Sequence, residues 1–133
     1  MKDEAMYEAI THGIRVSVSP QFLDHESDDD RFFWAYTVVI ENEGEKTAQL
    51  KTRYWQITDA KGRVEEVRGP GVVGETPVLK PGESFTYTSG CPLNEPSGMM
   101  VGSYGMMDAD GEPFEVEIPA FSLDSPEGRS TLN

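Results

Sequence analysis

The sequence predicts an all-β fold: an antiparallel β-sandwich of the fibronectin type III or immunoglobulin type, with about seven strands. Three observations support this prediction. Apolar and polar residues alternate with a period of two in several stretches, which is typical of half-buried strands. Turn-forming residues separate these stretches at intervals of roughly 8–12 residues. No stretch has a sustained period of 3.6, so we expect no helix longer than about two turns.

The first half of the chain carries four of the expected strands. Residues 14–19 alternate between apolar and polar side chains, as in a strand with one buried face. Residues 32–40 are apolar on both faces, which indicates a strand covered on both sides or central in a sandwich. Residues 50–57 form the third strand, and the turn-forming residues 59–62 follow it. The charged segment 63–68 is expected to form a short strand after this turn, at an edge of the sheet.

The second half carries the remaining three strands. Lys80-Pro81-Gly82-Glu83 is a turn sequence, and residues 85–89 alternate after it. Residues 99–107 form a strand that contains several glycines, and Asp108-Ala109-Asp110-Gly111 turns the chain back.

The last strand contains a break in its apolar pattern. Phe114, Val116 and Ile118 share one face, but after Pro119 the apolar phase slips by one residue. We expect a β-bulge or bend at Pro119, where proline is tolerated.

The chain is expected to form a single domain over residues 1–133, with a packed region of about 10–124. The ends 1–9 and 125–133 and the acidic loop 24–30 are expected to be the weakly ordered parts. The expected core residues are Ile14, Val16, Val18, Trp34, Tyr36, Val38, Ile40, Leu50, Trp55, Phe85, Tyr87, Val101, Tyr104, Phe114, Val116 and Ile118.

Composition excludes several classes of function. The formal net charge of −13 opposes nucleic-acid binding and docking on an anionic membrane. No apolar run is long enough to span a bilayer, and the acidic N-terminal residues do not resemble a secretory signal. The single cysteine, Cys91, cannot form an internal disulfide. These features favour a cytoplasmic protein with neutral or basic partners.

The run Gly69-Pro70-Gly71-Val72-Val73-Gly74 matches the letters of the dinucleotide-binding motif G-x-G-x-x-G. That motif requires a helix after the glycines, and Pro77 and Pro81 oppose a helix here. The run is therefore interpreted as a glycine-rich loop between strands. It is either a tight connection or a nest of backbone N–H groups for a phosphate-containing small molecule, with Arg53, Arg63 or Arg68 as counter-charge.

The same loop is a candidate docking site for an unknown protein partner. Rigid β-sandwiches carry recognition on their loops, and one of two adjacent valines remains exposed if the segment is extended. If instead both valines are buried, the loop is structural. The candidate partner- or ligand-binding residues are Arg68, Gly69, Gly71, Val72, Val73, Gly74 and Glu75.

No catalytic residue, cofactor or metal ligand is assigned from the sequence. His12 and His25 have no partner at a metal-ligand spacing, and Cys91 has no histidine near it in sequence. The cluster Asp28-Asp29-Asp30 lacks the spacing of a calcium loop. Methionines 99, 100, 106 and 107 suit either core filling or an adaptable binding surface. A binding or adaptor module is the preferred function, and an enzyme or sensor acting on nucleotides or pyrophosphate is the alternative.

The chain also resembles the ApaG (CorD) family over roughly residues 10–124. The resemblance is carried by Arg53-Tyr54-Trp55-Gln56-Ile57-Thr58-Asp59, by the segment 69–90, by residues 98–104 and by residues 114–121. It implies a fibronectin type III-like sandwich in a bacterial cytoplasmic protein, with links to cobalt resistance and magnesium efflux and no established enzymatic activity. Many relatives carry histidine where this chain has Tyr54, so a metal ligand at that position is not carried over.

Overall fold

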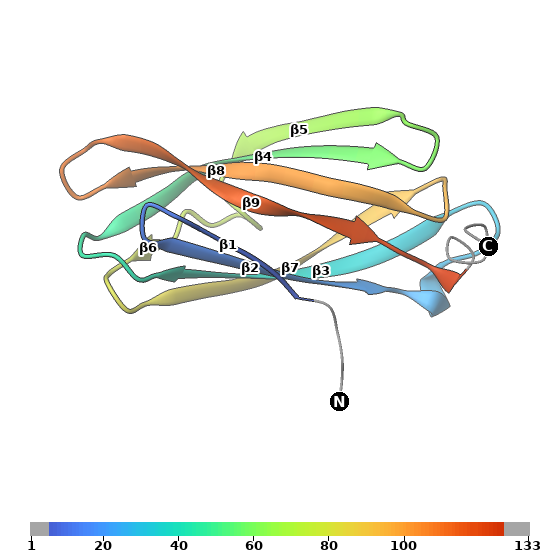
Figure 1. Ribbon diagram of the computed structural model, residues 1–133, viewed down its shortest axis with the longest axis horizontal. Helices are drawn as coiled ribbons and strands as arrows, with labels where there is room; N and C mark the ends of the chain where they lie inside the picture. Colours follow the sequence, from blue (N-terminus) through green and yellow to red (C-terminus); the bar gives the residue numbers. More distant parts are fainter. Residues whose placement is uncertain (1–5, 127–133) are drawn as a thin grey trace.

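The computed structural model describes residues 6–126, which form two antiparallel β-sheets stacked face to face (Figure 1). Within these residues there are nine strands and one short 3₁₀ helix, η1. Their bounds are β1 Tyr7–Thr11, β2 Ile14–Phe22, η1 Asp24–Glu26, β3 Phe32–Asn42, β4 Ala48–Asp59, β5 Val64–Pro70, β6 Val78–Leu79, β7 Ser84–Leu93, β8 Gly98–Asp108 and β9 Pro113–Leu123.

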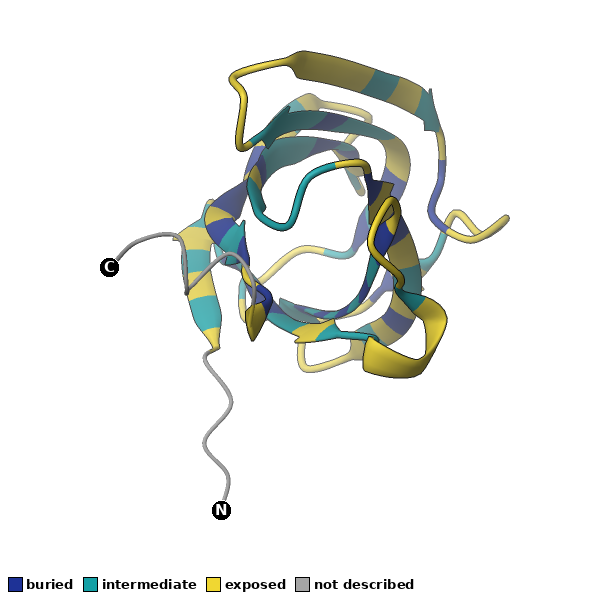
Figure 2. Cartoon of the chain, turned by 90° about the vertical axis from the view of Figure 1, so that its right-hand side faces the viewer, coloured by how far each residue is buried: buried dark blue, intermediate teal, exposed yellow. Residues whose placement is uncertain are grey.

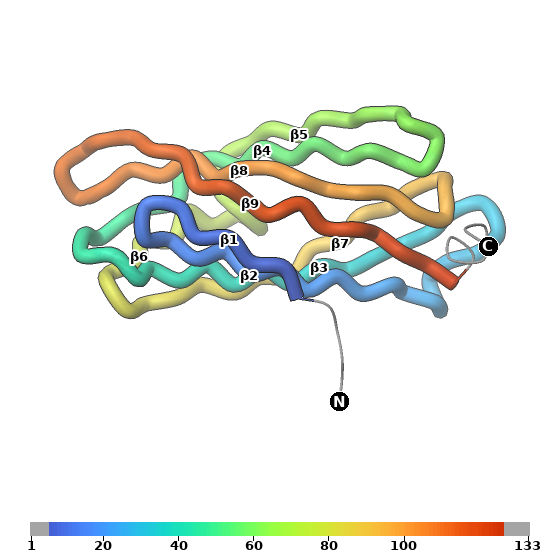
Figure 3. Tube along the Cα trace, in the orientation of Figure 1, coloured from blue at the N-terminus to red at the C-terminus, as the bar shows by residue number. Residues whose placement is uncertain are grey.

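One sheet has the strand order β1-β2-β3-β7, and the other has the order β5-β4-β8-β9, with β6 also paired to β4. On one side of the sandwich β1 lies against β9 (Figure 3). On the opposite side, β7 of one sheet and β5 and β6 of the other are edge strands. The sandwich predicted from the sequence is confirmed, and this second side is where the two sheets present free edges.

Seven of the nine strands in the described region correspond to those expected from the sequence. The segment 63–68 is confirmed as an edge strand, and residues 32–40 form a strand that is central in its sheet. The two strands not expected are β1 and β6. Strand β1 alternates only weakly, and β6 has two residues, so neither gives a clear periodic signal.

The expected bulge at Pro119 is confirmed by the pairing of β8 with β9. Gly102 pairs with Ile118 and Met100 pairs with Phe121, so one residue of β8 faces two residues of β9. The extra residue restores the inward direction of Phe121, which is 1% exposed.

Side chains between the two sheets form one apolar core, and Figure 2 shows the buried residues on the inner surfaces of the strands. Most of the expected core residues are buried, but three are corrected. Phe85 and Phe114 are only partly buried and pack against the core. Val101 is half-exposed because Met100 and Tyr104 occupy the inward positions of β8, and the alternation of the strand turns Val101 outward. The same alternation buries Met106 and leaves Met99 and Met107 exposed.

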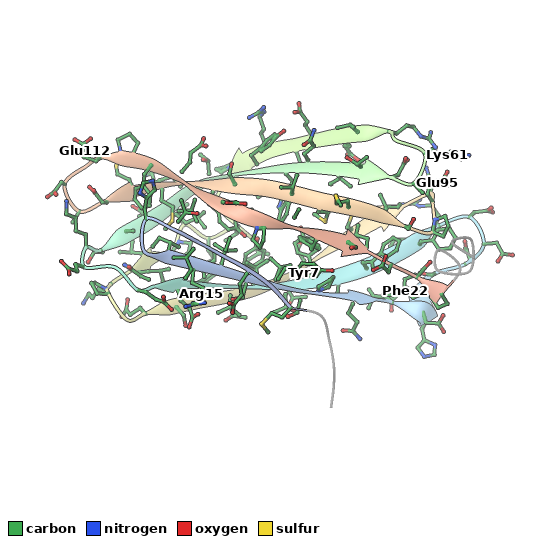
Figure 4. The ribbon with its side chains drawn as sticks, in the orientation of Figure 1. Tyr7, Arg15, Phe22, Lys61, Glu95 and Glu112 are labelled. Atoms are coloured by element: carbon green, nitrogen blue, oxygen red, sulfur yellow. The ribbon has the colours of Figure 1, made fainter. Side chains whose placement is uncertain are left out.

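The predicted turns are formed, with Gly62, Gly82 and Gly111 at positive φ. An ion pair from Lys61 to Glu95 links two loops at one end of the sandwich (Figure 4). Within the loop expected to be weakly ordered, residues 24–26 form η1, and the Asp28 carboxylate accepts two backbone N–H groups. Strand β1 begins inside the segment 1–9. Residues 1–5 and 127–133 of the expected flexible ends lie outside the described residues.

No helix in the described part of the chain is both long and apolar enough to cross a membrane.

Candidate functional site

The glycine-rich segment connects two strands that pair with the same edge of β4. Strand β5 pairs with residues 52–58 of β4, and β6 pairs with residues 48 and 49. A β-bulge in β4 lies between these two pairings, at Lys51, whose carbonyl accepts a hydrogen bond from the Gly71 N–H. The chain therefore leaves the edge of the sheet after Pro70 and rejoins it at Val78, and the residues between form a projecting loop.

The tip of this loop is a two-residue turn. Val72 and Glu75 exchange both backbone hydrogen bonds, at 2.9 and 2.8 Å. Val73 and Gly74, between them, have φ values of +42° and +81°. Two consecutive residues at positive φ define a type I′ turn, which favours asparagine or glycine at its first central position. A β-branched residue is rare there because its branched side chain crowds the backbone. We call residues 72–75 the I′ turn.

The two valines of the turn have opposite environments. Val72 is 1% exposed and belongs to the core, whereas Val73 is 55% exposed. The expectation that one valine remains exposed is met, and the expectation that Val72 could anchor a partner does not fit its burial. Gly71 has a φ of +60°, and a Cβ atom there would lie 2.3 Å from the Glu75 carbonyl oxygen. Only glycine fits this position without displacing the turn.

Arg53 of β4 holds the loop from inside. Its Nη1 donates hydrogen bonds to the carbonyl oxygens of Pro70 and Gly71, both at 2.9 Å. A Cβ atom on Gly69 would approach the Arg53 guanidinium to about 3.1 Å, so the glycine makes room for this side chain. The sequence offered Arg53 only as one of three counter-charges. Its contact with the loop arises from the pairing of β4 with β5, in which Arg53 lies opposite Gly69.

A small cavity of about 200 Å³ lies behind the I′ turn, between the two sheets. One sheet contributes Tyr36 from β3 with Tyr87 and Ser89 from β7, and the other contributes Arg53 and Trp55 from β4. The loop closes the cavity with Val72, Val73 and Gly74. Of the sequence-predicted site residues, these three are therefore brought together at one cavity. The tyrosines, the serine and the tryptophan of its wall are functional candidates that the sequence analysis missed.

The tyrosines of this region stay protonated. Burial raises the pKa of Tyr36 and of Tyr87, and it raises that of Tyr104 beneath them. The Tyr87 and Tyr104 hydroxyls share a short hydrogen bond. At neutral pH the cavity wall therefore presents neutral hydroxyl groups and one positive charge, that of Arg53.

Of the two charged candidate residues, Arg68 and Glu75, only Glu75 belongs to the I′ turn. Arg68 stacks over the Tyr54 ring on the outer face of its sheet, with the guanidinium carbon 4.3 Å from the ring centroid. The Tyr54 hydroxyl donates to Glu66 on the neighbouring strand. Glu75 is exposed at the end of the I′ turn. Glu75 is therefore the charged candidate residue at the turn, and Arg68 belongs to the outer face of the sheet.

Three backbone N–H groups in and beside the glycine run are used within the protein. Those of Gly71, Val72 and Glu75 donate to the carbonyls of Lys51, Glu75 and Val72. A phosphate nest formed by these N–H groups would have to break these bonds. The anion-binding interpretation of the loop stays a prediction, and these three N–H groups already have partners within the protein.

The remaining candidates lie elsewhere. His12 sits in the β1–β2 turn, where its ring packs against Phe114, and His25 lies in η1. Burial raises the pKa of the Cys91 thiol to about 11, which opposes its use as a nucleophile at neutral pH. Among residues 6–126, no three His, Cys, Asp or Glu side chains are grouped so that they could hold a metal ion.

Comparisons with known proteins give one consistent result. The ApaG domain model matches residues 23–108. Protein ApaG of Rhodospirillum centenum is 66% identical over 130 residues, covering 96% of this chain and the whole of the relative. Protein ApaG of Brucella anthropi is 59% identical over the same length.

Solved structures agree with the sequence comparisons. A crystal structure described as the putative ApaA protein from Bordetella pertussis superposes with a TM-score of 0.83 at 50% identity, covering 85% of this chain and 94% of that one. A second X-ray structure also gives a TM-score of 0.83, at 43% identity, with 90% and 92% coverage. The family model, the relatives and the shared sandwich together establish that the chain belongs to the ApaG domain family.

Proposed function

We propose that this protein is a non-enzymatic, cytoplasmic binding module that recognises a protein partner through the loop between β5 and β6 and the sheet edge on either side of it. We call residues 64–79 the edge surface. The observation that carries the proposal is the position of Val73. This β-branched residue is exposed at the tip of a tight turn, and its backbone has a conformation that suits glycine or asparagine. Unfavourable conformations of about 1–3 kcal/mol are concentrated at functional positions, where another gain offsets them.

The edge surface carries apolar side chains that the core does not use. Val64, Val73 and Val78 are 54–55% exposed, and all three belong to this one stretch of chain. Acidic residues lie between them, at Glu65, Glu66 and Glu75. The stretch has one cation, Arg68, against these three carboxylates, so its net charge is negative. Apolar contacts in a negatively charged stretch suit a partner segment that combines apolar and basic residues.

The backbone of the edge surface can also take part in recognition. Strand β5 pairs with β4 on one side only, so its outer edge presents N–H and C=O groups to solvent. An extended partner segment can add to such an edge as a further strand. We therefore expect the partner to contribute an extended basic segment that lies along β5 and contacts Val73.

The test is a single substitution, Val73→Asp. A double change at both valines is unsuitable because Val72 is part of the core and its replacement would unfold the protein. Partners are captured by crosslinking in bacterial cells and identified by mass spectrometry. The Val73→Asp protein should fold and lose the principal partner, because a charge on the turn opposes an apolar contact.

Ile10→Asp is the matched control. Ile10 is 55% exposed, as Val73 is, but it lies on β1 of the other sheet, on the opposite side of the sandwich from the edge surface, and the substitution adds the same charge. It should leave capture of the partner unchanged. Equal capture by the native protein and Val73→Asp would contradict the proposal.

The alternative of nucleotide or pyrophosphate binding at Gly69–Gly74 is tested by titrating each compound while following the backbone amide signals of the loop. Saturation at micromolar ligand would favour the alternative. Direct binding of Co²⁺ or Mg²⁺ is a third possibility, and calorimetry on metal-free protein tests it.

A further inference from the structure

We propose that the cavity behind the I′ turn is a binding site for a small organic monoanion, most simply a carboxylate, with Arg53 as its counter-ion. This site shares the I′ turn with the edge surface but lies behind it, between the sheets, and the rest of its wall comes from β3, β4 and β7. The proposal rests on the charge of the cavity, its hydrogen-bonding groups and its size.

The charge argument comes from a comparison of two half-buried arginines. Arg15 on β2, labelled in Figure 4, is surrounded by carboxylates. Glu8, Glu41 and Glu43 each have an oxygen within 3.8 Å of its guanidinium nitrogens. Arg53 is also half-buried, but the hydrogen bonds of its guanidinium go to two neutral carbonyls. Among the described residues, no carboxylate lies within 4 Å of it. In a chain with a net charge of −13, this leaves a cation at a cavity without a negative partner.

A guanidinium has five N–H donors arranged as a planar fork, which matches the two oxygens of a carboxylate. The Arg53 Nη1 is occupied by the loop carbonyls, and the guanidinium forms part of the cavity wall. The carbonyls hold the guanidinium in place, so the Arg53 side chain loses little conformational entropy when a ligand binds.

Hydroxyl groups complete the polar side of the cavity. Tyr36 and Ser89 lie directly opposite each other on β3 and β7, and Tyr87 is on the same inner face of β7. The Tyr87 hydroxyl shares a hydrogen bond with Tyr104, and the Tyr36 hydroxyl interacts with Ser89, so each pair keeps one O–H that can donate to an anion. Because the buried tyrosines remain protonated, they do not neutralise Arg53. The indole of Trp55 and the side chain of Val72 provide apolar walls for the rest of the ligand.

Size and charge together select the ligand class. A volume of about 200 Å³ is below the roughly 300–1,000 Å³ typical of sites for drug-sized ligands. A single lining cation suits one negative charge, whereas a nucleoside triphosphate carries several. The cavity therefore favours a compact carboxylate of about the size of benzoate over a nucleotide.

The experiment is a titration of the full-length protein with benzoate, followed by ¹⁵N amide shifts. The expected result is saturable shifts at Val73, Gly74 and Ser89. Inorganic phosphate, pyrophosphate and ATP form the other arms and should bind more weakly than benzoate. Arg53→Gln should weaken benzoate binding at least about tenfold, because a hydrogen bond to a charged group is lost.

Arg68→Gln is the matched control, since it removes the same charge from the outer face of the neighbouring strand and should leave benzoate affinity unchanged. Arg53 also holds the loop, so its replacement could disturb the loop as well as the cavity. A second variant therefore fills the cavity and leaves Arg53 in place. Ser89→Leu should abolish the shifts, whereas Thr86→Leu, on the opposite face of β7, should preserve them.

Three results would overturn the proposal. These are the absence of saturation at tens of millimolar benzoate, unchanged affinity in both Arg53→Gln and Ser89→Leu, and tighter binding of pyrophosphate or ATP than of benzoate. None of them depends on a protein partner, so failure here is distinguishable from failure of the edge-surface proposal.

Discussion

Replacing the two adjacent valines of the I′ turn, one at a time, should have opposite effects on stability. Val72→Ala removes two buried carbon atoms from a side chain that is 1% exposed. At about 0.8 kcal/mol per buried methylene, with a further contribution from the cavity left behind, the expected loss is about 2–3 kcal/mol.

Val73→Asn should instead leave stability unchanged or increase it. Asparagine at this position creates Asn-Gly, the favoured pair for a type I′ turn. Relief of the left-handed conformation is worth about 1–2 kcal/mol for an ordinary residue. The loss of partial burial of a side chain that is 55% exposed opposes this by up to about 1 kcal/mol. The net expectation is a gain of about 0.5–1 kcal/mol, or roughly 2–4 °C in Tm.

The assay is urea unfolding followed by tryptophan fluorescence, with the m-value compared between variants to check for a two-state transition. The two variants should differ by about 3 kcal/mol. A loss of more than about 1 kcal/mol in Val73→Asn would show that Val73 is not held in an unfavourable conformation, and the main support for the edge surface would fail. A loss below about 1 kcal/mol in Val72→Ala would place Val72 outside the core.

Four other predictions test the fold and the loop. Trp55→Ala should lose about 3–5 kcal/mol of stability, since the indole is 3% exposed; a loss below about 1 kcal/mol would contradict its burial. Gly71→Ala should be more destabilising than Gly74→Ala, because both glycines have positive φ but only the Gly71 Cβ would meet a carbonyl; equal urea midpoints would refute this. The Cys91 thiol should react with a disulfide reagent at pH 8 far more slowly in the native protein than in urea, because burial raises its pKa to about 11. Backbone N–H groups hold the pKa of Asp108 below its usual value. The stability that the ionised Asp108 contributes is therefore present above about pH 4 and is lost as the pH falls through the folded-state pKa. In acid unfolding curves, the stability difference between native protein and Asp108→Ala should shrink below about pH 4.

Much of the fold could be predicted because its signals are local. The alternation in residues 14–19 and 32–40 depends on the two-residue repeat of a strand, and the turn at Gly62 depends on a residue that accepts positive φ. The bulge at Pro119 was visible as a slip in the same repeat. Val101 was misplaced because a strand interrupted by glycines gives a weak alternation, and β6 was missed because two residues cannot show a period.

The candidate site was predicted only in part. The glycine run itself marked the loop, and its prolines excluded a dinucleotide-binding helix. The sequence did not determine which of the two valines is buried. The burial of Val72 depends on how the type I′ turn is oriented on the sheet edge. The bulge at Lys51 and the hydrogen bonds of Arg53 to the loop carbonyls set this orientation.

The sequence by itself determined the β class, the turn positions and the acidic character of the surface, because each depends on neighbouring residues or on composition. Only the tertiary structure brought Tyr36, Arg53 and Ser89 to one cavity. These residues lie on three different strands in two sheets, and their approach depends on strand pairing and sheet stacking over long sequence separations. Contacts of that kind leave no periodic trace in a single sequence, which is why the loop was found from its glycines and the cavity behind it was not.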